Sequence, residues 1–88
     1  TGGGLGEMLT SISGSSAYFW GGIISYDNSV KEKALGVDPT AIATLGAVSD
    51  EVAKQMAQGV RSRLNTPWGL GITGVAGPGG GTKEKPVG

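Results

Sequence analysis

The distribution of glycine constrains this chain more than any other feature of its sequence. There are 18 glycines among 88 residues, well above the usual fraction of about 7%. Many of them gather near the two ends, in residues 2–6 and 74–81. A flexible linker would have such a composition, but apolar residues interleave with the glycines and two periodic segments separate the clusters. The pattern therefore favours a folded chain in which glycine-rich loops flank regular elements.

The N-terminal residues predict a helix followed by a strand. Residues 1–12 carry apolar side chains at i, i+3, i+4 and i+7, one face of a helix: Leu5, Met8, Leu9 and Ile12. The N–H groups of the preceding glycines, free at a helix N-terminus, suit an anion. Residues 14–16 break this helix, and the aromatic and β-branched run over 19–26 predicts a strand.

Two short helices are predicted next. The first covers 29–35, with Asn28 as its cap. The second covers 39–45, with Asp38 as its cap and Pro39 in the favoured first position. A glycine follows each of them and ends it.

The second half of the chain holds the strongest predicted helix. Residues 49–51 open it and 65–67 end it. Its apolar residues recur at every fourth position: Val52, Met56, Val60 and Leu64. Residues 68–73 then predict a buried strand, 74–81 a glycine-proline loop, and 82–88 a polar end without an element of its own.

Alternating helices and strands place the chain in the α/β class, and its length allows one domain over residues 1–88. Two strands alone do not make a stable sheet. Further strands are therefore expected before Thr1 and after Gly88.

Composition excludes several classes of function. Seven basic and seven acidic residues give a net charge of zero, which argues against a nucleic-acid-binding face. No apolar stretch approaches the ~18–20 residues that span a bilayer. Cysteine and histidine are absent, so we expect no disulfide and no zinc site. Hydrolytic chemistry here needs another base, such as lysine, tyrosine or a carboxylate.

Two glycine motifs lead to different functional predictions. Residues 69–74 match G-x-G-x-x-G, but the glycines lie within the predicted strand and Pro78 follows in a loop. A dinucleotide site needs a helix there, so this match is expected to be a decoy. Residues 77–82 follow a strand, and their successive N–H groups could form an anion nest. A mobile surface loop is the equal alternative for 77–82.

The ordered set of motifs resembles the C-terminal domain of the CinA family and covers the whole chain. The matching pieces are Thr1-Gly2-Gly3, Gly14-Ser15-Ser16-Ala17, Tyr26 through Lys31, Leu35-Gly36-Val37, Gly46-Ala47-Val48-Ser49 and Gly71 to Gly88. The resemblance implies a three-layer α/β/α sandwich, of which this chain would be the central part, lacking the first strand and the C-terminal part. It also implies a cytoplasmic location and a homodimer when full length.

The family's activity implies a hydrolase, nicotinamide-nucleotide amidase, which converts nicotinamide mononucleotide and water to nicotinate mononucleotide and ammonia without a cofactor or metal. Carried over by motif, the catalytic group is Ser16 as nucleophile, Lys31 as general base and Tyr26 as its partner. Ser15 is the alternative nucleophile. The expected substrate-binding residues are Thr1, Gly2, Gly3, Ser15, Asn28, Thr73, Gly74, Gly77, Gly79 and Gly80.

Two other functions stay open. One is a non-enzymatic nucleotide- or phosphate-binding module that uses the glycine loops. The other is a regulatory module for competence or DNA-damage proteins, although the neutral charge argues against direct DNA binding.

Overall fold

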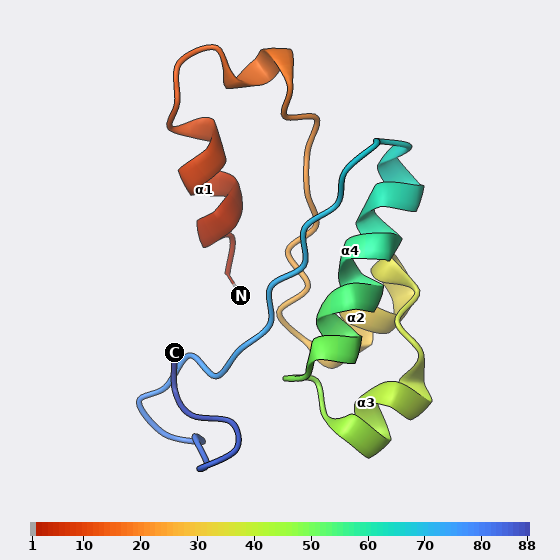
Figure 1. The fold of residues 1–88 in the computed structure, drawn as a ribbon, viewed down its shortest axis with the longest axis vertical. Helices are drawn as coiled ribbons and strands as arrows, with labels where there is room; N and C mark the ends of the chain where they lie inside the picture. The colour runs from red at the N-terminus through yellow and green to blue at the C-terminus, as the bar shows by residue number, and fades with distance from the viewer. Residues whose placement is uncertain (1) are drawn as a thin grey trace.

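The computed structural model describes residues 2–88. In chain order it contains α1 (Gly4–Thr10), the 3₁₀ helix η1 (Ser15–Ala17), α2 (Asn28–Leu35), α3 (Pro39–Leu45) and α4 (Asp50–Leu64) (Figure 1). Two extended segments, 19–26 and 68–74, run in the same direction along the molecule (Figure 1). They lie between α1 on one side and the α2–α4 pair on the other.

Side-chain caps set the starts of the helices. Asp27 begins α2 by accepting a hydrogen bond from Ser29 N at 2.9 Å, so the cap lies one residue before the expected Asn28. Asn28 is instead the first helical residue, because Asp27 has the extended conformation that a cap requires. Asp38 caps α3 as expected, accepting from Thr40 N at 2.9 Å.

The closed core lies among α2, α3 and α4. Ser49 caps α4, and the predicted four-residue repeat of this helix supplies two of the buried side chains, Val52 and Met56. The buried apolar residues are Leu35, Val37, Ala41, Val52 and Met56, with Ile23, Ile42 and Val60 packed against them.

Three glycines allow elements to approach α4 closely. A Cβ at Gly59 would lie 2.0 Å from the carbonyl oxygen of Leu35, so α2 and α4 meet backbone to backbone. A Cβ at Gly69 or Gly71 would lie 2.2 Å from a carbonyl oxygen of α4. These contacts explain the G-x-G-x-x-G match as packing on a helix. Within residues 75–88 no helix follows it, so the decoy interpretation is confirmed.

The segment 68–74 is only half buried, contrary to the expected buried strand. Gly69 and Gly71 face α4, whereas Trp68 is 85% exposed and Leu70 62%. Alternate residues of an extended chain point to opposite faces, and α4 covers one face only. The same difference affects the N-terminal residues, where Leu5 and Leu9 of α1 are half-buried but Met8 and, just after the helix, Ile12 are exposed.

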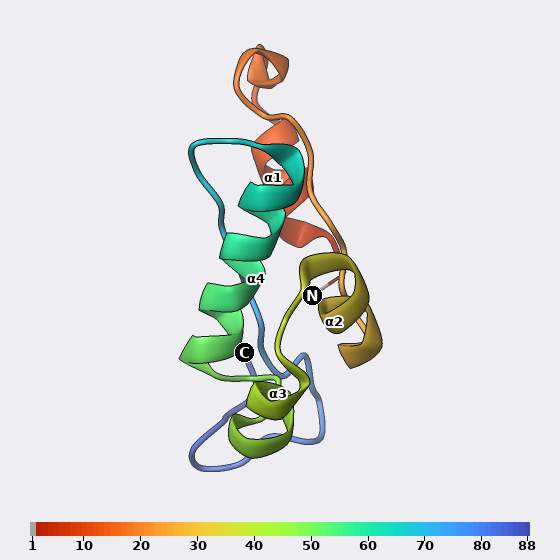
Figure 2. The same cartoon turned by 90° about the vertical axis from the view of Figure 1, so that its right-hand side faces the viewer.

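The two extended segments are not joined in a sheet. Among residues 2–88 the recorded β-bridge is an isolated parallel one between Val75 and Val87. In Figure 2 the segments lie on either side of the C-terminal half of α4. The helices of the α/β prediction are therefore present, while the expected strands are extended chain without a partner.

The glycine-rich tail folds back on the rest of the chain. Gly88 N donates to the Val75 carbonyl at 2.8 Å, which closes the predicted loop. Lys85 Nζ donates to the carbonyl of Leu45 at 2.6 Å, at the C-terminal end of α3, where a cation is favoured. The polar end thus has fixed contacts although it forms no helix or strand.

Candidate active site

Lys31 is the most unusual polar residue of the molecule. It lies in the first turn of α2 and is only 5% exposed, although a solvated helix lysine would be the ordinary expectation. Its Nζ donates to the carbonyl of Ser25 at 2.8 Å and more weakly to that of Tyr26 at 3.4 Å. Both partners are backbone carbonyls, so no carboxylate neutralises the amine through these bonds. Burial and the two backbone acceptors hold the amine at the end of the segment 19–26.

Ser25 lies beside this lysine and was not among the residues that the sequence predicted. Ser25 is 2% exposed, and its Oγ has no hydrogen-bond partner within residues 2–88. Buried hydroxyls are nearly always bonded, so such an exception needs an explanation. The period-two alternation of 19–26 could have identified Ser25, because it places Ser25 on the same inward face as Ile23.

Tyr26 and Asp27, which precede α2, both interact with the amine of Lys31. The Tyr26 side chain is 72% exposed, and its contact with Lys31 is through the carbonyl rather than the hydroxyl. Hydrogen bonds from the Ser29 hydroxyl and backbone N–H lower the pKa of Asp27, and the charge of Lys31 lowers it further. Asp27 therefore stays an anion near the amine.

Ser16 does not lie beside Lys31. It is exposed in η1, which stands at the opposite end of the segment 19–26 from α2 (Figure 1). The seven residues from Phe19 to Ser25 span roughly 20 Å when extended. The structure thus brings Tyr26 and Lys31 together and leaves Ser16 apart. Ser15 is buried but belongs to the same distant turn.

The expected substrate-binding residues fall into separate places. Thr1 lies outside the described residues. Gly3 has a positive φ of 106° at the start of α1 and lies against Ile24, near the Ser25 end of the segment. Thr73 already donates its hydroxyl to the carbonyl of Ala47 at 2.9 Å. The remaining ones are exposed or lie in the loops, namely Gly2, Asn28, Gly74, Gly77, Gly79 and Gly80.

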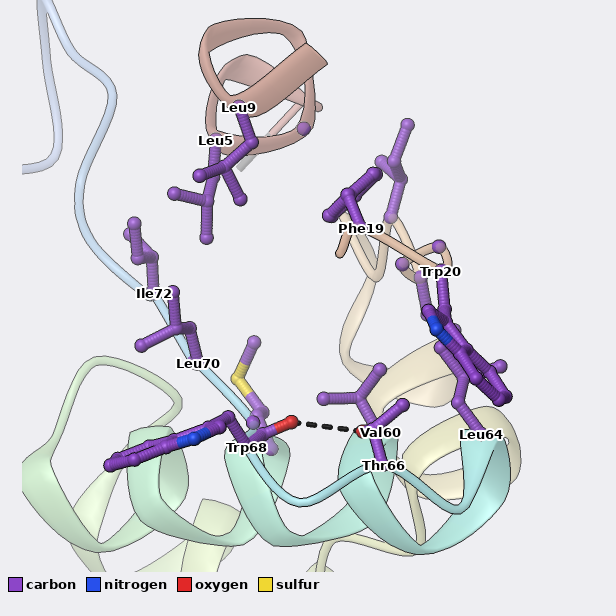
Figure 3. Close-up of a pocket in the computed structure, with 18 of the residues that line it drawn as sticks. Leu5, Leu9, Phe19, Trp20, Val60, Leu64, Thr66, Trp68, Leu70 and Ile72 are labelled. Carbon is purple, nitrogen blue, oxygen red and sulfur yellow. Dashed lines mark hydrogen bonds between the residues drawn. The ribbon is translucent and has the colours of Figure 1, made fainter. Parts of the chain in front are cut away.

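A cavity of about 830 Å³ adjoins Ser25 (Figure 3), and we call it the slot. Its two walls are residues 18–25 and 66–72. α1 covers it with Leu5 and Leu9, and α4 forms its floor with Met56, Val60 and Leu64. The slot is thus apolar above and below, and the buried hydroxyl of Ser25 lies at one end.

Comparison with known proteins now assigns the family. The family model described as the CinA C-terminal domain matches residues 1–88. The chain belongs to the CinA C-terminal domain family. A CinA-like protein of Cyanothece sp. is 73% identical over the whole chain, and one of Synechocystis sp. is 64% identical.

Solved structures of CinA proteins share this fold. The competence/damage inducible protein CihA of Agrobacterium tumefaciens matches 98% of the chain with a TM-score of 0.84 and 43% identity. A CinA superfamily protein of Enterobacter cloacae matches 99% with a TM-score of 0.90 and 31% identity. The chain spans 52% of each of these two proteins and 21% of the Cyanothece relative. Within residues 2–88 no helix is long and apolar enough to cross a membrane.

Proposed function

We propose that this chain contributes the catalytic lysine of a nicotinamide-nucleotide amidase, Lys31, and that the full-length protein acts in the cytoplasm as a homodimer. The substrate is nicotinamide mononucleotide, and the products are nicotinate mononucleotide and ammonia. Membership of the CinA family supports the proposal. The burial of Lys31 with two backbone acceptors is the single structural observation that carries it.

In the proposed reaction Lys31 acts as general base. A serine hydroxyl attacks the carboxamide carbon, and its proton passes to Lys31 Nζ. Lys31 then gives the proton to the leaving nitrogen, which departs as ammonia, and water hydrolyses the resulting ester. Tyr26 orients the amine through its carbonyl.

Ser16 is the nucleophile that the family motif implies, and its distance from Lys31 sets a condition on that role. Ser16 can serve only if η1 moves to the Ser25 end of the segment 19–26. Otherwise the attacking hydroxyl comes from another residue. Substitution of Ser16 separates these two cases.

The proposed architecture is a three-layer α/β/α sandwich. α1 lies on one side of the extended segments and α2 and α4 on the other (Figure 1), as the outer layers would. The segments 19–26 and 68–74 run in the same direction, which suits the parallel strands of such a fold. The missing element is the pairing between them.

Ammonia release from nicotinamide mononucleotide tests the activity. We expect Lys31→Met in the full-length protein to reduce the rate at least ~100-fold, the usual effect of losing a general base. Methionine retains the length of the buried side chain. Lys33→Met is the matched control, since Lys33 is exposed on the same helix, and should keep the wild-type rate.

The outcomes distinguish the parts of the proposal. Equal rates in Lys31→Met and wild type would contradict the assignment of Lys31. Loss of activity in Lys31→Met but not in Ser16→Ala would support Lys31 as the base and assign the nucleophile to a residue other than Ser16. Absence of ammonia release by the wild-type protein would exclude the amidase.

A phosphate-binding module without catalysis is the second candidate. The positive φ of Gly77 and Gly80 and the separation of Ser16 from Lys31 favour it. Binding of nicotinamide mononucleotide without ammonia release would support this function. The same result would also be compatible with the competence-related role that the relatives' names suggest.

A further inference from the structure

Residues 75–88 form a loop that closes on itself, which we call the closed loop. Its two ends meet at the parallel bridge between Val75 and Val87. The Val87 side chain fills the interior, where a Cβ at Gly77 would lie 2.5 Å from it and a Cβ at Gly81 2.8 Å. Surface loops with close ends and their own side chains packed inside are compact and frequently functional. The closed loop is therefore a defined structure rather than a free tail.

One turn of the closed loop presents free backbone donors. Gly79, Gly80 and Gly81 are exposed, and within residues 2–88 their N–H groups donate no hydrogen bond to a backbone carbonyl. Gly80 has a φ of 84°, which glycine adopts without steric cost. Successive backbone N–H groups in such a turn form a concavity that binds anions. The turn thus suits the phosphate group of a nucleotide.

This glycine turn and Lys31 lie beyond the same ends of the two extended segments. The segments 19–26 and 68–74 run in the same direction (Figure 1). α2, which carries Lys31, follows the first segment, and the closed loop follows the second. In open α/β folds, ligands bind outside the carboxyl ends of the strands. One nucleotide at this edge would therefore present its carboxamide and its phosphate to the two elements.

Lys85 fixes the closed loop to the helical part of the molecule. Its half-buried side chain donates from Nζ to the carbonyl of Leu45, the last residue of α3, at 2.6 Å. Gly46 leaves room for the ammonium group, because a Cβ there would collide with Nζ. The main chain of Lys85 is bonded too, since its N–H donates to Thr82 Oγ1 at 3.0 Å and its carbonyl accepts from Thr82 N at 2.9 Å. Thr82 directly follows the glycine turn, so Lys85 connects that turn to α3.

We propose that Lys85 is a positioning residue for substrate binding: it holds the closed loop against α3 and so keeps the N–H groups of Gly79, Gly80 and Gly81 in place for the substrate phosphate. The proposal rests on the proposed function and adds to it the means by which the phosphate is recognised. A loop that is already ordered loses less conformational entropy when it binds. Lys85 touches no reacting atom, so it acts on substrate affinity and leaves the chemical step unchanged.

Steady-state kinetics of the full-length protein test this role. Lys85→Met should raise the KM for nicotinamide mononucleotide about 10-fold, the usual effect of losing a hydrogen bond from a charged group, and leave kcat within about twofold. With nicotinamide riboside, the same substrate without its phosphate, Lys85→Met and wild type should have equal kinetic constants. Lys83→Met is the matched control, because Lys83 is an exposed lysine of the same loop, and should retain the wild-type KM.

Amide hydrogen exchange without substrate tests the positioning directly. In Lys85→Met the Thr82 amide should exchange at least ~10-fold faster, because the loop opens more often once its bond to α3 is lost. The amides of α4 should keep their wild-type exchange, which shows that the variant is folded. Unchanged exchange at Thr82 together with weaker substrate binding would mean that Lys85 contacts the phosphate itself, and would overturn the positioning role.

The kinetic results that would overturn the proposal are equally specific. An unchanged KM, or a lower kcat at an unchanged KM, would exclude a role of Lys85 in affinity. An equal loss with nicotinamide riboside would exclude the phosphate as the group recognised. An equal effect of Lys83→Met would assign the change to general charge attraction. Calorimetric binding of the mononucleotide and of the riboside gives the same comparison without ammonia release, so failure of the amidase and failure of this proposal are distinguishable.

Discussion

The closed core and the slot use similar apolar residues but reach opposite outcomes. In the core, α2, α3 and α4 enclose Leu35, Val37 and Val52, and every backbone group of these helices away from their ends is paired within its own helix. In the slot, extended segments leave their backbone edges open, and Leu70 remains exposed. Helices close locally, whereas strands depend on neighbours. The difference shows why this chain has one completed core and one unfilled cavity.

The largest expected effect breaks the core at its closest backbone contact. Gly59→Ala would place a Cβ 2.0 Å from the Leu35 carbonyl oxygen, and overpacking of this kind costs about 3 kcal/mol. Urea unfolding measures the loss. Gly6→Ala is the control, because Gly6 also lies in a helix and has nothing within 4 Å of the added atom. Equal stability of the two variants would contradict the close α2–α4 packing.

The same substitution in the two regions sharpens the comparison. Leu35 is 4% exposed and Leu70 62%. Leu35→Ala should lower the free energy of unfolding by about 3 kcal/mol, and Leu70→Ala should change it by less than about 0.5 kcal/mol. Thermal or urea unfolding of both variants provides the measurement. A similar cost at Leu70 would mean that the slot is already filled.

The smallest expected effect lies at Asp27, where the segment 19–26 passes into α2. Hydrogen bonds from Ser29 hold the pKa of Asp27 below 3.8 in the folded state. The ionised cap therefore contributes stability above that value, and the contribution is lost as pH falls through the lowered folded pKa. Asp27→Asn keeps a cap acceptor but removes the titrating group. The free energy of unfolding should therefore depend less steeply on pH between about pH 5 and pH 2, the range in which carboxylates titrate. An unchanged dependence would assign it to other carboxylates.

Local sequence signals predicted the helices well. The cap Asp38, the repeat in α4 and the glycines that end α2 and α3 act within a few residues, so they are visible in the sequence. The cap of α2 was misplaced by one residue because Asp27 and Asn28 are both good caps. The family was also predicted correctly from its motifs.

Long-range relations were not predictable in the same way. Sequence spacing gave no sign that Lys31 folds back onto the Ser25 carbonyl, nor that Ser25 would be left without a partner. The motif placed Ser16 with Lys31, but an extended segment separates them here. Contacts of this kind depend on which elements pack together rather than on neighbouring residues.

The sequence by itself determined where the helices begin and end, the absence of cysteine and histidine chemistry, and membership of the CinA family. Only the tertiary structure decided that Gly59, Gly69 and Gly71 serve close packing on α4, that Lys31 is buried, and that a slot lies between two extended segments. The physical reason is that helix hydrogen bonds form within a segment, whereas burial and strand pairing depend on what the rest of the polypeptide places beside it.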